Sequence, residues 1–477
     1  MANPILPEQL ATRRRFLDMG LRMGTAALAT MLGREGFASA TAARIVNPLA
    51  PKPPHFAPKA RSVIQLFMTG GPSHLDMFDY KPALAEFADQ PLPESMVKRL
   101  QFAQIRDGQP LVMPSPWKFA QHGESGQWVT ELLPHTADVV DDLTFVRTVV
   151  TTETVHPHAE YMLNTGHRNS GRPSLGAWLV YGLGSESENL PGYIVINSNG
   201  PTRGKNGNYH NGFLPPAYQG VEIRSQGEPI LNTTNPPGIT VGDQKQVVDA
   251  VNQLNLLRYG ENSDREIAAR ISAYELAFSL QASAPELTDL SGESAETLQL
   301  YGCQPQQPSF ARDCLLARRM VERGVRFVQI HMGDWDHHTD IAVSHPGQCR
   351  AIDQACGALV KDLKQRGMLD ETLVIWGGEF GRTPVAQPKQ GTSGVGRDHH
   401  ISAFTMWMAG GGLKPGSVGQ TDDFGCFPVE DAVETFDLHA TILKLLGLDH
   451  ERLTYRYQGR DFRLTDVYGR VIDKMIA

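Results

Sequence analysis

Carboxylate and imidazole side chains recur in four short clusters, each beside an apolar run of the chain. The clusters lie at residues 70–76, 333–338, 377–383 and 396–400. Divalent-metal sites are built from this mixture, because Asp and Glu supply oxygen ligands and neutral His supplies nitrogen ligands. A single Asp or His in a loop is more often a helix cap or a surface group. Four clusters in equivalent positions instead favour one shared metal site.

The candidate metal ligands are the acidic residues and histidines of these clusters. They are His74, Asp76, Asp336, His338, Glu379, His399 and His400. Mixed oxygen and nitrogen ligands suit Zn, Mn or Ca, and ligand softness does not decide among them. Arg382 and Arg397 lie in the same clusters, where a guanidinium is suited to grip sulfate, phosphate or carboxylate. A role as ordinary surface residues is equally compatible with the sequence.

The elements that must position these clusters are visible as short apolar runs. Buried strands are expected at residues 62–69, 144–150, 193–197, 326–331, 372–376 and 405–408. Amphipathic helices are expected at residues 264–282, 310–323, 348–366 and 435–446. This alternation predicts an α/β fold, a mostly parallel sheet flanked by helices. Open sheets of this kind bind ligands at the carboxyl ends of their strands, where three of the four clusters lie.

Composition narrows the class of protein. The chain has 477 residues, a formal net charge of −8 and a pI near 6.1, which disfavours a general nucleic-acid binder. No apolar run reaches the ~18 residues that span a membrane. Five cysteines in a chain of this length do not form a disulfide framework. Residues 198–245 are rich in Gly, Asn and Pro, which predicts a functional loop or an insertion within one domain.

The amino-terminal residues resemble a twin-arginine export signal. Residues 12–17 read TRRRFL, residues 19–32 are weakly apolar, and Ala38-Ser39-Ala40 fits a cleavage site. An ordinary amphipathic first helix is the alternative. We expect a signal at residues 1–42, a Pro/Ala-rich linker at 43–60 and one domain at 61–477. The twin-arginine machinery would then be a partner, and the mature protein would be periplasmic or extracellular.

The order of the clusters resembles the alkaline phosphatase and sulfatase superfamily. There, a first-strand Asp precedes a nucleophile segment, an Asp/His pair, an acidic residue with His, and a final His. The residues that fill this order are Asp76, Asp336 with His338, Glu379, and His399 or His400. Glu379 stands where the superfamily usually has Asp. Phe380 stands where a His often follows, so one expected ligand is missing.

The nucleophile segment departs most from that superfamily. Residues 154–166 resemble the sulfatase segment, but His156 occupies the position of the catalytic Cys or Ser, so a formylglycine sulfatase is not expected. His156 could bind a metal that activates water, or it could attack the substrate covalently. Thr151, Thr152 or Thr154 could instead replace the nucleophile. A catalytically inactive site is a further alternative.

The mature chain resembles, more specifically, the exported, sulfatase-like domain-of-unknown-function family 1501. The matching segments lie at residues 70–82, 171–193, 211–221, 372–383, 396–416 and 453–466. The resemblance implies an alkaline-phosphatase-like fold with long loop insertions, export and a metal-hydrolase-like site. Two functions are then expected as alternatives. One is a divalent-metal-dependent hydrolase of sulfuric or phosphoric esters, with His156 and Arg382 or Arg397 in catalysis. The other is an inactive module that binds a sulfated or phosphorylated glycan.

Overall fold

The computed structural model describes residues 47–105, 109–224, 238–262, 286–387 and 394–477, with single residues between 267 and 280. The expected signal at 1–42 and most of the helix expected at 264–282 lie outside the described residues. Among the residues that are described, no helix is both long enough and apolar enough to cross a membrane.

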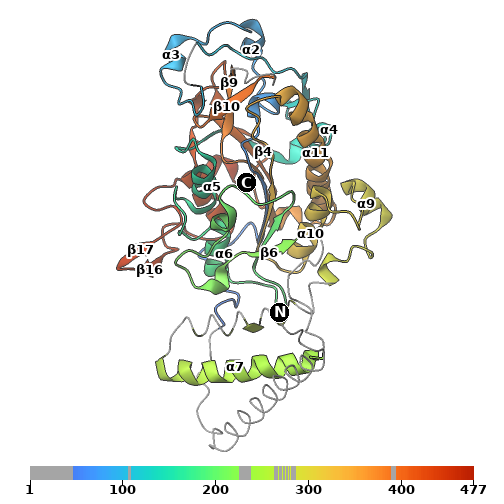
Figure 1. Cartoon of the computed structure of the whole chain (residues 1–477), viewed down its shortest axis with the longest axis vertical. Coiled ribbons are helices and arrows are strands. Elements are labelled where there is room, and N and C mark those ends of the chain that lie inside the picture. Colours follow the sequence, from blue (N-terminus) through green and yellow to red (C-terminus); the bar gives the residue numbers. More distant parts are fainter. Residues whose placement is uncertain are drawn as a thin grey trace, which may run out of the picture. The chain divides into compact units, whose positions relative to one another are not determined.

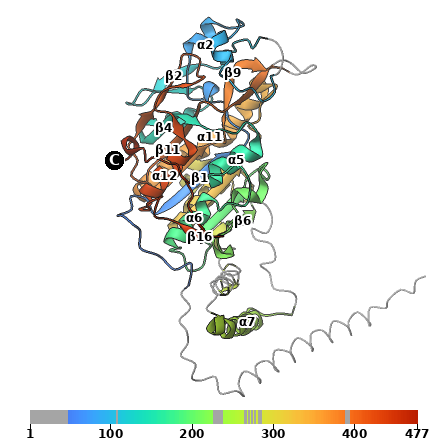
Figure 2. The same cartoon turned by 90° about the vertical axis from the view of Figure 1, so that its left-hand side faces the viewer.

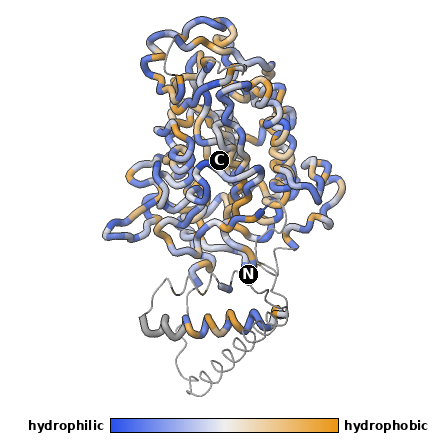
Figure 3. The backbone as a smooth tube through the Cα atoms, viewed as in Figure 1, coloured by the Kyte–Doolittle hydropathy of each residue, from blue (hydrophilic) through white to orange (hydrophobic). Residues whose placement is uncertain are grey.

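The chain divides into two compact units. One comprises residues 49–231 and 282–477, and it contains the central sheet and every candidate site residue. The other comprises residues 1–48 and 232–281 and contains helix α7 (Val241–Asn262). Apolar and polar residues alternate along the coloured part of α7 in Figure 3. This second unit includes part of the segment that the sequence marks as an insertion. The single domain expected over residues 61–477 stays a prediction.

A large sheet forms the centre of the first unit (Figure 1). In the described residues its strand order is β12-β4-β11-β8-β1-β7-β5-β6, with β15 also paired to β4. The strands are β1 (Ser62–Met68), β4 (Leu143–Val150), β5 (Tyr193–Asn197), β6 (Val221–Arg224), β7 (Phe327–Met332), β8 (Thr372–Gly377), β11 (Phe404–Ala409), β12 (Gly416–Val418) and β15 (Val433–Glu434). Only β11 runs antiparallel to its neighbours, β4 and β8. The predicted mostly parallel sheet is therefore confirmed.

Helices cover both faces of this sheet, which explains why its central strands are apolar along their whole length. The helices are α5 (His156–Thr165), α6 (Leu175–Leu183), α10 (Phe310–Glu322), α11 (Ile341–Gln365) and α12 (Thr435–Leu445). Figure 1 shows α5 and α6 on one side of the sheet and α10 and α11 on the other. Val63 and Phe67 of β1 share a buried cluster with Trp178 of α6. The predicted α/β class with flanking helices is confirmed.

The other α-helices and strands of the described residues are α2 (Pro82–Glu86), α3 (Glu94–Val97), β2 (Phe119–His122), β3 (Gln127–Thr130), α4 (Pro134–Ala137), α9 (Ala295–Tyr301), β9 (Gly381–Gln387), β10 (Gly396–His400), β13 (Gln420–Thr421), β14 (Pro428–Glu430), β16 (Tyr455–Tyr457) and β17 (Arg460–Phe462).

A smaller lobe is built on the carboxyl end of β1. Strands β9 and β10 pair antiparallel. Leu75, Val112 and Val385 share the apolar core of this lobe. Figures 1 and 2 show α2 and β9 at the same end of the unit.

All five cysteines of the chain are buried and free. Burial raises the pKa of Cys314, Cys349 and Cys356, so these side chains are neutral thiols at physiological pH. The cysteines pack in the protein interior, and no two of them form a disulfide.

Candidate metal centre

Four candidate side chains converge at the carboxyl edge of the sheet. They are His156, Asp336, His338 and His399, and one potential ligand atom from each lies within 4.8 Å of the other three. His338 Nε2 lies 2.9 Å from both Asp336 Oδ1 and His399 Nε2. His156 Nε2 lies 3.1 Å from Asp336 Oδ2. The first residue of α5, the segment after β7, and β10 thus bring one aspartate and three histidines together.

Each of the three imidazoles donates a hydrogen bond from its Nδ1 atom, which fixes the orientation of the ring. The Nδ1 donors and their acceptors are His156 with Glu379 Oε1 (2.7 Å), His338 with Gln387 Oε1 (2.5 Å), and His399 with the Thr154 carbonyl (2.7 Å). A neutral ring that donates from Nδ1 presents a bare lone pair on Nε2, which is the arrangement of a metal-binding histidine.

The contact between two of these nitrogens tests whether a metal fits. Nε2 of His338 and Nε2 of His399 are 2.9 Å apart. When both rings donate from Nδ1, neither Nε2 carries a proton, so no hydrogen bond joins them and their lone pairs repel. A cation shared by the two nitrogens removes that repulsion. Nε2 of His156 is also buried without an accepted hydrogen bond in the described residues. The residues present therefore fit a divalent metal.

The charges around the cluster favour a cation at this position. Burial lowers the pKa of His156, but the carboxylates of Asp336 and Glu379 outweigh burial and raise it to about 9. Burial raises the pKa of Asp336, but its contacts with His156, His338 and His399 and the charge of Arg382 hold it well below its usual range. Asp336 therefore stays ionised, and the site attracts positive charge as a proton or as a metal ion.

Glu379 lies behind His156 and outside the four-residue cluster. Its Oε1 and Oε2 atoms accept the Gly70 N–H at 2.9 and 3.2 Å, and Oε1 also accepts from His156 Nδ1. The sequence analysis grouped Glu379 with the metal ligands. In the structure it orients the His156 ring, because its side chain is fully buried and its oxygens accept hydrogen bonds from His156 and Gly70.

Asp76 and Arg397, expected as a ligand and as an anion-binding residue, are bound to each other instead. Arg397 Nε and Nη2 donate to the two Asp76 oxygens at 2.7 and 3.1 Å, and Ser73 Oγ donates to Asp76 at 2.5 Å. Arg397 Nη1 also donates to the carbonyls of Met113 and Thr383. Both charged groups are fully buried. This pair joins β10 to the segment after β1, and its hydrogen-bonding groups are already occupied.

His74 and His400 form a second pair outside the cluster. Their rings stack with centroids 6.1 Å apart, and His400 Nε2 donates to the Cys426 carbonyl at 2.8 Å. Burial lowers the pKa of His74 to about 4 and that of His400 to about 3, so both rings are neutral. Neighbouring residues of a strand face opposite sides, which explains why His399 reaches the cluster and His400 does not.

Arg382 is buried and positions Asp336. Its Nη2 donates to Asp336 Oδ1 at 2.7 Å and to the Gly70 carbonyl, and its Nε donates to the Gly71 carbonyl at 2.8 Å. Its side chain is 1% exposed. The sequence suggested that Arg382 binds a substrate anion. In the structure its guanidinium binds Asp336 and two backbone carbonyls instead.

Two glutamines complete the surroundings of His338, and the sequence analysis did not single them out. Gln104 Nε2 lies 3.0 Å from His338 Nε2, and Gln104 Oε1 accepts from Gln387 Nε2 at 2.9 Å. Asp398 Oδ2 accepts the N–H groups of Gln104 and Ile105 at 2.8 and 3.0 Å. Neither glutamine lies in a cluster of acids and histidines. The sequence feature that could have pointed to this arrangement is Asp398, an acidic residue directly before His399.

Arg203 is an exposed cation beside the cluster. Its Nη2 lies 3.6 Å from Asp336 Oδ2, and its side chain is 63% exposed. The buried Glu160 of α5 accepts the N–H groups of Arg203 and Gly204 at 3.2 and 2.6 Å. Glu160, which binds this loop, therefore lies one helical turn after His156 in α5. Arg203 lies within residues 198–245, for which the sequence predicts a functional loop or an insertion.

The fold and the cluster define an α/β protein with a candidate metal centre of three histidines and one aspartate at the carboxyl edge of its sheet. The chain matches the family model described as "Protein of unknown function (DUF1501)" over residues 60–476 and belongs to that family, which confirms the expected membership. A search of curated proteins finds no match.

Solved structures similar to this chain include, by title, a lipoteichoic acid synthase, a sulfatase and an alkaline phosphatase. The lipoteichoic acid synthase LtaP from Listeria monocytogenes is 10% identical, with a TM-score of 0.36, and the match covers 89% of this chain and 80% of that one. A sulfatase from Pseudoalteromonas sp. is 12% identical, with a TM-score of 0.35 and coverage of 82% and 68%. The alkaline phosphatase from the Antarctic bacterium TAB5 is 11% identical, with a TM-score of 0.31 and coverage of 81% and 98%.

Proposed function

We propose that this protein is a divalent-metal-dependent hydrolase of sulfuric or phosphoric esters. The observation that carries the proposal is the convergence of three Nδ1-anchored imidazoles on the Asp336 carboxylate. His156, Asp336, His338 and His399 would hold the metal. A bound divalent cation polarises an ester oxygen and lowers the pKa of water toward neutrality. The imidazole-rich ligand set favours Zn and disfavours Ca, which prefers oxygen ligands.

His156 acts as a ligand in this proposal, rather than as a covalent nucleophile. Its Nδ1 is committed to Glu379 and its Nε2 faces Asp336, so neither nitrogen is directed at a separate substrate position. Of the interpretations that the sequence left open, the geometry supports metal ligation by His156.

Arg203 would bind the anionic group of the ester. Arg382 and Arg397 are buried and fully engaged, whereas Arg203 is exposed and lies 3.6 Å from Asp336. A guanidinium there can form two parallel hydrogen bonds with sulfate or phosphate oxygens. The backbone hydrogen bonds to Glu160 hold the base of this side chain and leave its end free to turn toward a substrate.

The first test is the metal content of the purified mature protein, measured by mass spectrometry after metal supplementation. We expect about one equivalent in the wild type, because the candidate ligands form a single cluster. His338→Ala should lose the metal, while His135→Ala, which changes an exposed histidine outside the cluster, should keep it. Retention of metal by folded His338→Ala, or a metal-free wild type, would contradict the proposal.

Activity is tested next on sulfate monoesters, phosphate monoesters and phosphodiesters. We expect turnover that requires the metal, and a raised KM in Arg203→Gln. Metal binding without turnover across this panel would support the second candidate, a non-catalytic module that binds a sulfated or phosphorylated glycan. The observation that favours this candidate is the histidine at the usual nucleophile position.

We propose further that the chain is exported by the twin-arginine machinery and works in the periplasm or outside the cell. The TRRRFL motif at residues 12–17 and the small residues Ala38-Ser39-Ala40 support this location.

A further inference from the structure

A second cavity lies beside α5 and contains none of the four metal-cluster residues. Its volume is about 460 Å³, within the range of small-molecule sites. The end of β4, the carboxyl-terminal half of α5, the beginning of α12 and the segment after β17 form its walls. Glu153 lines it, and the next residue, Thr154, accepts the hydrogen bond that anchors His399. The cavity therefore begins close to the candidate metal centre.

An aromatic pair forms one wall of this cavity. The rings of Phe436 and Tyr468 stack with centroids 4.8 Å apart and an interplanar angle of 28°. Tyr468 is 55% exposed, which is unusual for a large aromatic residue that serves only to pack. The negative face of an aromatic ring attracts polarised C–H groups, and the hydroxyl of a tyrosine can form hydrogen bonds. This wall suits a ligand with both C–H faces and hydroxyl groups.

A carboxylate and a guanidinium stand side by side at the same cavity. Glu153 Oε2 lies 3.5 Å from Arg168 Nη2, and Arg168 is exposed. The carboxylate accepts hydrogen bonds and the guanidinium donates them, so together they match adjacent hydroxyls of a sugar ring. Charged, hydroxyl and aromatic groups arranged around one space of this size correspond to a saccharide better than to an apolar molecule.

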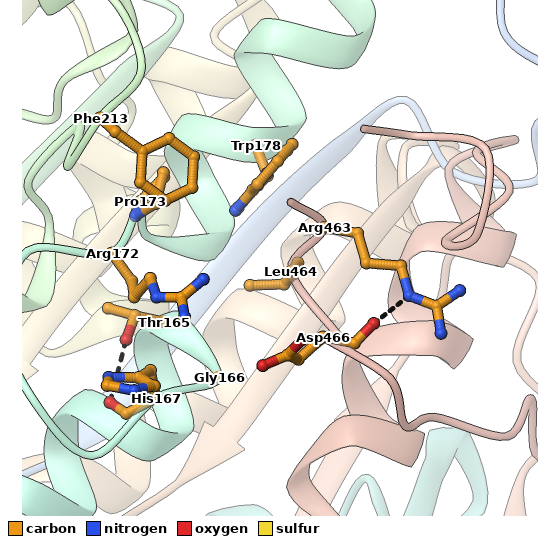
Figure 4. Close-up of a pocket in the computed structure, with 10 residues that line it drawn as sticks. All are labelled: Thr165, Gly166, His167, Arg172, Pro173, Trp178, Phe213, Arg463, Leu464 and Asp466. Atoms are coloured by element: carbon orange, nitrogen blue, oxygen red, sulfur yellow. Dashed lines mark hydrogen bonds between the residues drawn. The ribbon is translucent and has the colours of Figure 1, made fainter. Parts of the chain in front are cut away.

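A smaller cavity adjoins the first one. It shares Gly166, His167 and Asp466 with the larger cavity (Figure 4). Its volume is about 10 Å³, which is the space of a single water molecule, so it does not hold a second sugar unit. The saccharide site is therefore confined to the larger cavity.

We infer that the larger cavity binds a saccharide ring, which carries or adjoins the ester group presented to the metal centre. The ester part of this inference rests on the proposed function. The carbohydrate part does not, because no member of the metal cluster lines the cavity. Saccharide binding should therefore persist after the metal has been removed.

The test is calorimetric titration of the metal-stripped, full mature protein. The probes are neutral, sulfated and phosphorylated oligosaccharides of glucose, galactose, mannose and N-acetylglucosamine. We expect at least one of them to bind the wild type, and to bind Tyr468→Ala and Arg168→Gln about tenfold more weakly, as the loss of one stacking contact or one ligand hydrogen bond implies. Both side chains line the cavity and are exposed, so these variants should fold normally.

Tyr80→Ala is the matched control, because Tyr80 is another exposed tyrosine stacked on an aromatic ring, that of Phe119, and it does not line the cavity. Its saccharide affinity should equal that of the wild type. The inference is overturned if no oligosaccharide of the panel binds, or if Tyr468→Ala binds as tightly as the wild type. Since these titrations need neither metal nor turnover, they remain informative if the ester panel is negative. Conversely, turnover of simple esters with no saccharide binding would leave the proposed hydrolase standing without this subsite.

Discussion

Single residues of the same type have different roles in this protein, and their partners decide which. Asp336 and Asp76 both follow strands of the sheet, but Asp336 faces three imidazoles whereas Asp76 is neutralised by Arg397. Sequence spacing suggested both as metal ligands. It could not separate them, because the partner of Asp76 lies 321 residues further along the chain. Only the folded structure shows that one carboxylate is left available for a cation.

The pairing of Asp76 with Arg397 gives a prediction about stability. Arg397→Ala leaves a buried carboxylate without its counter-charge, which should lower the free energy of unfolding by about 3–5 kcal/mol. Urea denaturation measures this loss. The double variant Asp76→Asn/Arg397→Met should recover much of it, because no uncompensated charge remains. A loss of metal from Arg397→Ala without any loss of stability would instead show that this pair belongs to the metal centre.

At the scale of elements, the sequence located the strand ends correctly but not the faces of the side chains. The apolar runs predicted β1, β4, β5, β7, β8 and β11, and the four clusters do lie near the carboxyl edge of the sheet. His399 and His400 were both expected as ligands, yet adjacent residues of β10 point in opposite directions. The short strands β6, β12 and β15 were not predicted, because two to four residues carry no clear apolar period.

Gly70, just after β1, allows the segment after β7 to approach closely because it has no side chain. Its φ is +113°, and a Cβ built on it would lie 2.7 Å from the Asp336 nitrogen and 2.9 Å from the Trp335 nitrogen. Gly70→Ala must therefore shift the segment that carries Asp336 and His338. We expect metal affinity to fall by at least about tenfold while the fold is kept, since ligand positions tolerate little displacement. Competition with a fluorescent chelator measures the affinity.

Gly171→Ala is the matched control for this prediction. Gly171 also has a positive φ, of +102°, but a Cβ there would meet nothing within 4 Å. Its substitution carries the backbone strain without the collision. Metal affinity close to that of the wild type in Gly171→Ala, with a clear loss in Gly70→Ala, would assign the effect to the displaced segment. Equal affinities in both variants would refute the prediction.

At the scale of the whole molecule, the export proposal makes a prediction about localisation. The double variant Arg13→Lys/Arg14→Lys should remain inside the cell with its amino-terminal segment uncleaved, because the twin-arginine machinery reads the arginine pair rather than its charge. Cell fractionation followed by intact-mass measurement detects both effects. Arg15→Lys, the neighbouring residue of the same run, should still be exported. Unchanged export of the double variant would exclude this route.

The five free, buried thiols have a consequence for where this molecule can mature. A protein that relies on disulfides must finish folding in an oxidising compartment, whereas this chain has no cross-link to form. The candidate ligands come from positions as distant as His156 and His399, so the proposed metal centre can form only once the chain has folded. Folding and metal loading can therefore both be completed under the reducing conditions of the cytoplasm, and the protein should be insensitive to thiol reductants throughout its purification and storage.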